Sequence, residues 1–275
     1  MRVHLGLAVG TACLLTALAP VLVGLVWLPH DPLLPGPQPL APPSLQHPMG
    51  TDWFGRDVLA RVMAGGRSSL AVALLAVAAG GAVGTLGGAL AGYAGGLADE
   101  AVMRLVDALL AFPAILAALV LGTVWGPGLA GVTTALALFN VPFFARLARA
   151  GFVALKEREF VSAARASGAG PWWIVSRHLL PNLASPLLVQ ATVSLGAALL
   201  AEASLSYLRL GVQPPFPAWG RMLREAQEAS ILSPWPAVFP GAVLALAVLG
   251  LNLIGDALRD VLDPTFRPLT RPRPW

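Results

Sequence analysis

Two carboxylates, Asp107 and Glu202, stand at the edges of long apolar runs and are the clearest candidates for chemistry in this chain. A carboxylate inside a membrane segment is a candidate for carrying protons or cations. Both residues are predicted close to a helix end, however, and Arg104 stands one turn before Asp107. We therefore favour interfacial carboxylates that are paired or wetted, while a role in a transport pathway stays open. Asn140 and Asn252 are further polar candidates, and we expect each to hold helices together.

Motifs of bond-breaking enzymes are absent from the sequence. There is no G-x-S-x-G, H-E-x-x-H or G-x-x-x-x-G-K-[ST] pattern, so we expect no catalytic residue and no nucleotide bound by this chain itself. The single cysteine, Cys13, can form no disulfide within the chain. The four histidines are far apart in the sequence and match no ligand spacing, so no metal site is expected either. They are His4, His30, His47 and His178.

The composition places the chain in a membrane. Of its 275 residues, 56% are hydrophobic and 12% are charged, whereas soluble domains carry about 25% charged residues. Such a chain cannot cover its own surface with polar groups. Basic residues beside membrane spans explain its net charge of +4, so nucleic acid is not expected as a partner.

Six transmembrane helices are predicted from five runs that lack Asp, Glu, Lys and Arg. About 20 apolar residues cross a bilayer as a helix. The run 108–145 has 38 residues, too many for one span, and Gly126-Pro127-Gly128 breaks it into a helical hairpin. The fold class is therefore an all-α, polytopic membrane protein. The predicted spans are 5–28, 69–93, 102–122, 129–149, 183–207 and 236–256. The length of the first run favours an uncleaved span over a signal peptide.

The basic residues set the predicted orientation. With the N-terminus inside, the inner segments hold 12 Lys and Arg residues and the outer segments hold six. Because such residues concentrate in cytoplasmic loops, both termini and the loop 156–182 are predicted to be cytoplasmic. We divide the chain into 1–68, with the first span and a Pro-rich outer loop, a core 69–264 with five spans, and a cytoplasmic tail 265–275.

Short amphipathic helices are predicted outside the spans. Residues 29–48 carry eight prolines and cannot form a helix. The apolar residues of 58–63 share one face of a short helix that would lie along the membrane surface. A second short helix is predicted from Trp219 to Ala229, with Trp219 at the level of the interface. A charged helix after the last span is predicted to end at Pro264.

A ladder of glycines lies in the second predicted span. Its members, here called the glycine ridge, recur at every fourth position: Gly80, Gly84, Gly88, Gly92 and Gly96. One helix face therefore has almost no side chains, which lets another helix approach closely. The ridge indicates packing rather than chemistry. Whether the neighbouring helix belongs to this chain or to a second subunit stays open.

The loop 156–182 is a polar and basic island between apolar runs. Its Ser162-Ala163-Ala164 run is predicted to begin a short docking helix, Gly168 to break it, and Pro171 to begin a new first turn. Small exposed residues let the surface of another protein come close to the backbone. We interpret this loop as the place where the membrane part is moved by a partner outside the membrane.

The same loop resembles the EAA loop of ABC importer permeases. That pattern is E-A-A-x-x-x-G-x9-I-x-L-P, and this chain has Ser162 in place of Glu and His178 in place of Ile. Because Ser162 replaces Glu, it stays open whether this position makes the ionic contact that Glu would make. By this resemblance the ATPase-coupling residues are Glu159, Ser162, Ala163, Ala164, Arg165, Gly168, Pro171, His178, Leu180 and Pro181.

Four further stretches look like the C-type permeases of the dipeptide, oligopeptide and nickel family. They are 47–70, 103–113, 202–223 and 252–264, so the resemblance covers nearly the whole chain. Arg209 stands where this family usually has Gly. The resemblance implies the type I ABC importer permease fold, in the plasma (inner) membrane of a prokaryote and surrounded by its lipid.

The resemblance also implies partners. A similar second permease subunit would complete the translocation pathway, and two ATPase subunits would bind ATP and Mg²⁺ and receive the loop. An extracytoplasmic binding protein would deliver peptides, nickel or a related solute. This chain itself would bind no cofactor and would not be an enzyme. Two other hypotheses are a gradient-driven secondary transporter or channel, resting on Asp107 and Glu202, and a membrane scaffold without a substrate.

Overall fold

The computed structural model describes residues 2–113, 116–117, 120–121 and 128–262, and apart from one isolated bridge this part is free of β-structure. Its elements are α1 (Arg2–Gly24), α2 (Val58–Ala94), α3 (Gly96–Ala111), α5 (Leu129–Lys156), α6 (Glu159–Ala166), α7 (Pro171–Ile174), the π-helix η1 (Val175–Leu179), α8 (Leu180–Asn182), α9 (Ala184–Tyr207), α10 (Trp219–Ala229) and α11 (Trp235–Leu262). The predicted all-α class is confirmed.

Five of the described helices, α1, α2, α5, α9 and α11, are long and apolar enough to cross a membrane. The predicted span 102–122 is not among them. α3 ends at Ala111, and Phe112 is extended because the residue before a proline, here Pro113, disfavours helical backbone. Gly126 and Pro127, the predicted hairpin break, lie outside the described residues. The sixth span therefore stays a prediction.

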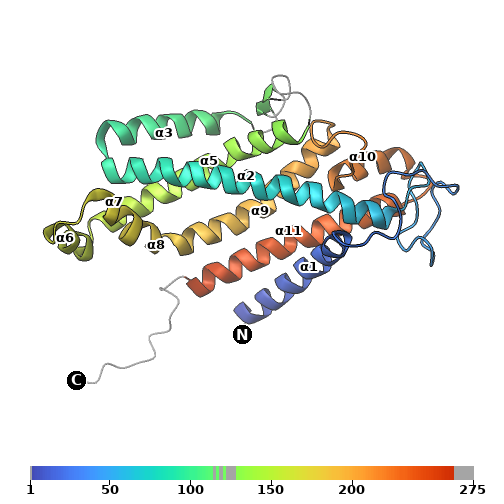
Figure 1. Cartoon of the computed structure of the whole chain (residues 1–275), viewed down its shortest axis with the longest axis horizontal. Helices are drawn as coiled ribbons and strands as arrows, with labels where there is room; N and C mark the ends of the chain where they lie inside the picture. Colours follow the sequence, from blue (N-terminus) through green and yellow to red (C-terminus); the bar gives the residue numbers. More distant parts are fainter. Residues whose placement is uncertain (1, 114–115, 118–119, 122–127, 263–275) are drawn as a thin grey trace.

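The long helices lie side by side, and the bundle has two different ends (Figure 1). α2 packs along α5, while α11 packs against both α1 and α9. One end holds α6, α7 and α8 and is called here the α6 end. The opposite end, the α10 end, holds α10 and the segment 25–57 between α1 and α2. Sites at the two ends are therefore separated by the length of the bundle.

The glycine ridge packs against α5 of this same chain, which answers the question that its spacing leaves open. Cβ atoms added to the ridge would meet the α5 backbone at regular steps, pairing Gly80 with Ala137, Gly84 with Val141, Gly88 with Ala145 and Gly92 with Arg149. Matching steps of four residues on both helices let the two backbones approach along several turns. Gly96 is not part of this contact, because it begins α3 and no atom lies within 4 Å of its Cβ position.

The prediction of a separate surface helix over 58–63 is wrong. These residues are the first turns of α2, which continues without a break through Gly65 and Gly66. Val58 and Val62 are fully buried. A Cβ at Gly66 would overlap Val21 and lie 2.7 Å from the Trp219 ring. The apolar face of 58–63 is thus covered by protein rather than by lipid headgroups.

α10 has the predicted bounds, and its first residue, Trp219, is covered by protein. Trp219 is 0% exposed, its Nε1 donates to the Val62 carbonyl oxygen at 3.0 Å, and its backbone N donates to Ser69 Oγ at 3.2 Å. α10 packs between α9 and α11 and also contacts α2, so its first residue reaches the core.

Two helix ends also differ from the prediction. α1 ends at Gly24 rather than at residue 28. Up to Leu262, where the described residues end, no separate charged helix follows the last span, since α11 continues without a break. An uninterrupted helix keeps its backbone hydrogen bonds satisfied through the charged turns. Pro264, the predicted stop, lies outside the described residues.

Candidate coupling loop and ion-pair network

The loop 156–182 folds into short helices at the α6 end (Figure 1). α6 begins at Glu159, three residues before the predicted start at Ser162. Glu159 lies in its first turn and Arg165 in its last turn, an arrangement that complements the helix dipole. The local charges therefore extend this helix beyond its small residues.

Gly168 follows the end of α6 and breaks the helix, as predicted, with a φ of +83°. Its backbone N donates to the Arg165 carbonyl oxygen at 2.9 Å, and Ala169 N donates to that of Ala164 at 3.0 Å. These two bonds form a Schellman motif, which places a left-handed residue just after the helix. No atom lies within 4 Å of the Gly168 Cβ position, so the conformation rather than space requires glycine. Pro171 then occupies the first turn of α7, also as predicted.

One face of the loop is anchored in the protein and the other is open. Val161, Ile174 and Leu179 are at most 1% exposed and share a cluster with Phe152 of α5 and Ala89 of α2. On the outer side, Ser162, Ala163, Arg165 and Pro181 are exposed, and Leu180 is 37% exposed. The loop is therefore a fixed projection whose outer surface begins with two small residues.

The His178 ring packs beside two aromatic side chains of the same loop. Its ring centroid lies 4.7 Å from that of Trp173 and 6.0 Å from that of Phe160. Its backbone carbonyl accepts a hydrogen bond from the Asn182 side chain at 2.6 Å. The flat imidazole thus packs among aromatic rings, with its Nε2 atom buried and without a hydrogen-bond partner in the described part of the chain.

An ion pair ties α3 to α5 near the loop, and a hydrogen bond ties the end of α2 to α5. Arg149 binds the Asp99 carboxylate through two hydrogen bonds of 2.5 and 2.6 Å, and this bidentate contact holds the pKa of Asp99 below its usual range. The Lys156 ammonium donates to the Gly92 carbonyl oxygen at 3.0 Å, near the C-terminus of α2 where a cation is favourable. The base of the loop is thereby fixed to α2 and α3.

The four polar pathway candidates do not form a common site. Asp107 is 64% exposed and pairs with Arg146 at 2.6 Å, while Arg104 pairs with Glu100. Glu202 is fully buried rather than wetted and accepts a hydrogen bond from Ser206 Oγ at 2.6 Å.

The two asparagines lie apart from these carboxylates. Asn140 is buried and donates to the Leu136 carbonyl oxygen at 2.8 Å. Asn252 is exposed within the chain and lies against Gly196 of α9, whose Cβ position is 2.9 Å from Asn252 Oδ1. Asn252 thus sits where α9 and α11 meet.

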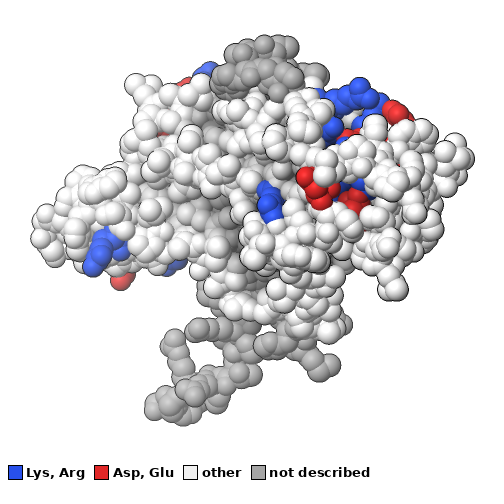
Figure 2. Space-filling model, turned by 45° about the vertical axis from the view of Figure 1, so that its right-hand side comes forward, with Lys and Arg blue, Asp and Glu red and all other residues white. Residues whose placement is uncertain are grey.

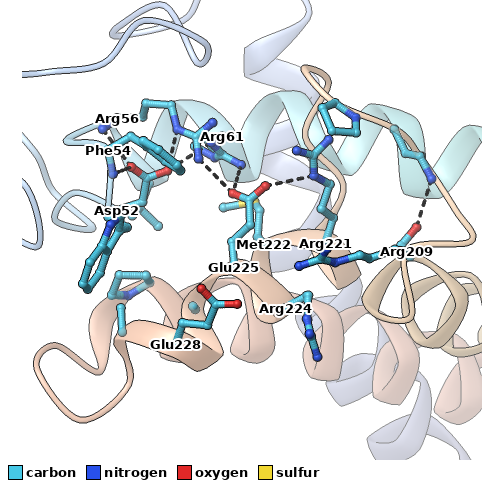
Figure 3. Close-up of a pocket in the computed structure, with 18 of the residues that line it drawn as sticks. Asp52, Phe54, Arg56, Arg61, Arg209, Arg221, Met222, Arg224, Glu225 and Glu228 are labelled. Atoms are coloured by element: carbon cyan, nitrogen blue, oxygen red, sulfur yellow. Dashed lines mark hydrogen bonds and ion pairs between the residues drawn. The ribbon is translucent and has the colours of Figure 1, made fainter.

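The α10 end holds an ion-pair network that the sequence alone did not reveal (Figure 3). Glu225 of α10 lies 2.8 Å from both Arg56 and Arg61 and 2.9 Å from Arg221. Asp52 completes the network, at 2.7 Å from Arg56 and 3.0 Å from Arg61. Arg61 is only 1% exposed. The network joins the segment before α2 to α10, which is more than 160 residues away in the sequence.

A cavity of about 510 Å³ lies beside this network. Arginines outnumber acidic residues in its lining, as the close-up shows (Figure 3). The surface over this end gathers acidic and basic side chains, whereas most of the visible face is uncharged (Figure 2). The charged surface and the cavity mark the α10 end as a site that faces water.

Glu225→Gln is expected to lower the free energy of unfolding by about 2 kcal/mol. Removing this carboxylate leaves the buried Arg61 with Asp52 as its remaining anion, and breaking part of a buried ion pair is costly. Denaturant unfolding of the purified chain in detergent measures the change. Glu228→Gln is the matched control, since Glu228 is exposed on the same helix, and equal losses for the two variants would contradict the assignment.

Arg209 occupies a backbone conformation that favours glycine. Its φ is +66°, and a left-handed conformation costs a non-glycine residue about 1–2 kcal/mol. Arg209→Gly is therefore expected to raise the free energy of unfolding by about 1 kcal/mol. Arg209→Ala keeps the strain and serves as the control. A gain of equal size in both variants would show that the guanidinium, not the backbone, is unfavourable.

Comparison with known proteins places the chain in a family. The family model described as "Binding-protein-dependent transport system inner membrane component" matches residues 84–268. The glutathione transport system permease protein GsiD of Pectobacterium atrosepticum is 44% identical over 225 residues, which cover 82% of this chain and 75% of that protein. The dipeptide transport system permease protein DppC of Alkalihalophilus pseudofirmus is 41% identical over 263 residues, which cover 95% of this chain and 85% of that protein.

A solved structure shares the fold. A chain of the MetNI methionine ABC transporter, in an inward-facing conformation, superposes with a TM-score of 0.57 at 22% identity, covering 72% of this chain and 95% of that one. Together with the apolar helices described above, these matches confirm the resemblance to the ABC importer permease family. The chain belongs to the binding-protein-dependent transport system inner membrane component family and is an ABC importer permease subunit.

Proposed function

We propose that this chain forms half of the pathway of a peptide importer and is driven through the loop 156–182. The observation that carries the proposal is the fixed projection at the α6 end, where Val161 is buried and Ala163 is exposed. A helix that is anchored in the protein and has small side chains on its outer face is suited to insertion into a groove on an ATPase subunit. Movement of that ATPase would pass through α6 to α2 and α5, on which the loop is anchored.

The proposed orientation has both termini and the α6 end in the cytoplasm. The twofold excess of basic residues on that side supports it. The charged α10 end would then face the extracytoplasmic binding protein, and a second permease subunit would complete the pathway. ATP and Mg²⁺ would be bound by two partner ATPase subunits rather than by this chain.

The proposed substrates are dipeptides and tripeptides. The relatives named above carry the names of glutathione and dipeptide transport systems, and both ligands are short peptides. The nickel alternative has no such support among those names. A gradient-driven carrier is not favoured either, because Glu202 is fully buried within the chain and Asp107 is paired at its surface.

Uptake by cells that lack the gene tests this function. Labelled dipeptide or glutathione should enter the parent strain, fail to enter the deletion strain, and enter again when the gene is restored. Collapse of the proton gradient with ATP maintained should leave uptake intact. Peptide uptake that is unchanged by the deletion, or that stops with the gradient while ATP is present, would overturn the proposal.

A further inference from the structure

Two histidines that the sequence places 17 residues apart lie together at the α10 end. His30 follows α1, His47 lies in the Pro-rich segment, and Asp57 caps the N-terminus of α2. The imidazole centroids of His30 and His47 are 4.7 Å apart. Their separation in the sequence, from which no metal site was expected, therefore did not predict that these two rings lie together in the fold.

We propose that His30, His47 and Asp57 form a binding site for a divalent transition-metal ion of the Zn²⁺ class. One ligand atom from each residue lies within 4.8 Å of the other two. Two imidazole nitrogens and one carboxylate oxygen are a ligand set that Zn²⁺ accepts, with water in the fourth position. In the described part of the chain, no other group of three such residues is arranged in this way.

The ligand atoms lie near the separations that a tetrahedral ion requires. Ligand bonds of about 2.0–2.2 Å place the ligand atoms of a tetrahedral site about 3.3 Å apart. His47 Nδ1 lies 2.9 Å from Asp57 Oδ1, and His30 Nδ1 lies 3.8 Å from Asp57 Oδ2. The two distances end on different oxygens of the Asp57 carboxylate, and they lie on either side of the ideal separation. Movement of the partly exposed His30 side chain toward Asp57 Oδ1 would bring both imidazoles to one carboxylate oxygen and admit the ion between the three side chains.

The backbone holds two of the three ligands in position. The Asp57 side chain is 0% exposed, and its Oδ2 accepts a hydrogen bond from Ala60 N at 2.7 Å as the cap of α2. The backbone of His47 is fixed by Ser44, which accepts from His47 N at 3.0 Å and donates to His47 O at 2.9 Å. Such outer contacts orient metal ligands before the ion arrives. His30 is the adjustable ligand, since 44% of its side chain is exposed.

The bound ion would connect three segments that share little other structure. It would fasten the exit from α1 and the Pro-rich segment to the first turn of α2. The same segment continues into Asp52 and Arg56 of the ion-pair network, so the site would stabilise the water-facing surface at the α10 end. This inference rests on geometry alone and does not depend on the proposed substrate.

Titration with Co²⁺ tests the site directly. The full chain, purified in detergent with a tag that contains no histidine, is titrated with Co²⁺ and its visible absorption is recorded. We expect one ion per chain with the intense bands of four-coordinate Co²⁺, and competition by Zn²⁺. His30→Ala and Asp57→Asn should each weaken binding at least tenfold. Asp57→Asn keeps a side-chain acceptor for Ala60 N, so it removes the anionic ligand without removing the helix cap.

A control variant and a measurement of the melting temperature accompany the titration. His4→Ala, at the opposite end of α1, should bind Co²⁺ as the parent chain does. Zn²⁺ should also raise the melting temperature of the parent chain but not that of His30→Ala, in which an exposed residue is changed and the fold is retained. The proposal is overturned if the folded parent chain binds no Co²⁺ at micromolar concentrations, or if His30→Ala and Asp57→Asn bind it as tightly as the parent. Peptide uptake plays no part in either readout.

Discussion

Ala163→Arg is expected to lower peptide uptake at least tenfold while the amount of the chain in the membrane stays unchanged. Ala163 is exposed on α6, on the side away from the buried Val161. An Arg there adds bulk and charge where a partner must approach the backbone. The fold is expected to be unaffected, because surface substitutions away from packing contacts change stability by about 0.5 kcal/mol or less. Initial uptake rates, divided by the membrane level of the chain, measure the effect.

Ala163→Ser is the matched control for this substitution. It keeps the small outer surface of α6 and should transport at close to the parental rate. Loss of the ATPase subunits from the purified Ala163→Arg complex would show that docking itself has failed. Parental uptake by Ala163→Arg at parental membrane levels would contradict the coupling role of the loop.

Gly88→Ala is expected to destabilise the chain by about 3 kcal/mol or more, so that little folded protein is recovered. Its Cβ would overlap the Ala145 carbonyl oxygen and lie 2.9 Å from the Ala145 Cα. Backbone atoms cannot rotate away as a flexible side chain can, so α2 and α5 must separate along the glycine ridge. Overpacking a well-packed contact costs about 1–3 kcal/mol even where side chains can adjust. Thermal unfolding in detergent and the fraction of monodisperse protein report the loss.

The adjacent glycine provides the control. A Cβ at Gly87 would meet only Val102 Cγ1, at an ordinary 3.7 Å. Alanine is also the better helix former by about 1 kcal/mol, so Gly87→Ala should be as stable as the parent or slightly more stable. If Gly88→Ala and Gly87→Ala unfold at the same temperature, the close contact between α2 and α5 is not what holds the bundle together.

Helix ends and turns that are determined by residues close together in the sequence were predictable. The bounds of α10, the break after α6 at Gly168 and the first turn at Pro171 all follow from local rules of helix periodicity, capping and proline geometry. The period of the glycine ridge likewise indicated close helix packing. Each of these signals lies within a few turns of chain, where spacing fixes which residues share a face.

Features that depend on distant segments were not predictable in this way. Glu225 binds Arg61 across 164 residues of sequence, and Trp219 donates to Val62 across 157. The apolar face of 58–63 has the same pattern whether lipid headgroups or α10 cover it, so a surface helix was predicted where the structure has buried turns. His30 and His47 are brought together by a Pro-rich segment, whose sequence has no helix or strand periodicity from which its path could be predicted. Tertiary packing decided all of these contacts.

Purification of the tagged chain from its native membranes in mild detergent tests the central claim most directly. The proteins that remain bound are identified, and ATP hydrolysis by the preparation is measured in vesicles with and without the peptide-loaded binding protein. The coupling account predicts a second permease subunit and two ATPase subunits, with hydrolysis stimulated by the loaded binding protein. It also predicts that Ala163→Arg abolishes this stimulation. A chain that purifies alone and still moves peptide across the vesicle membrane without ATP would contradict it.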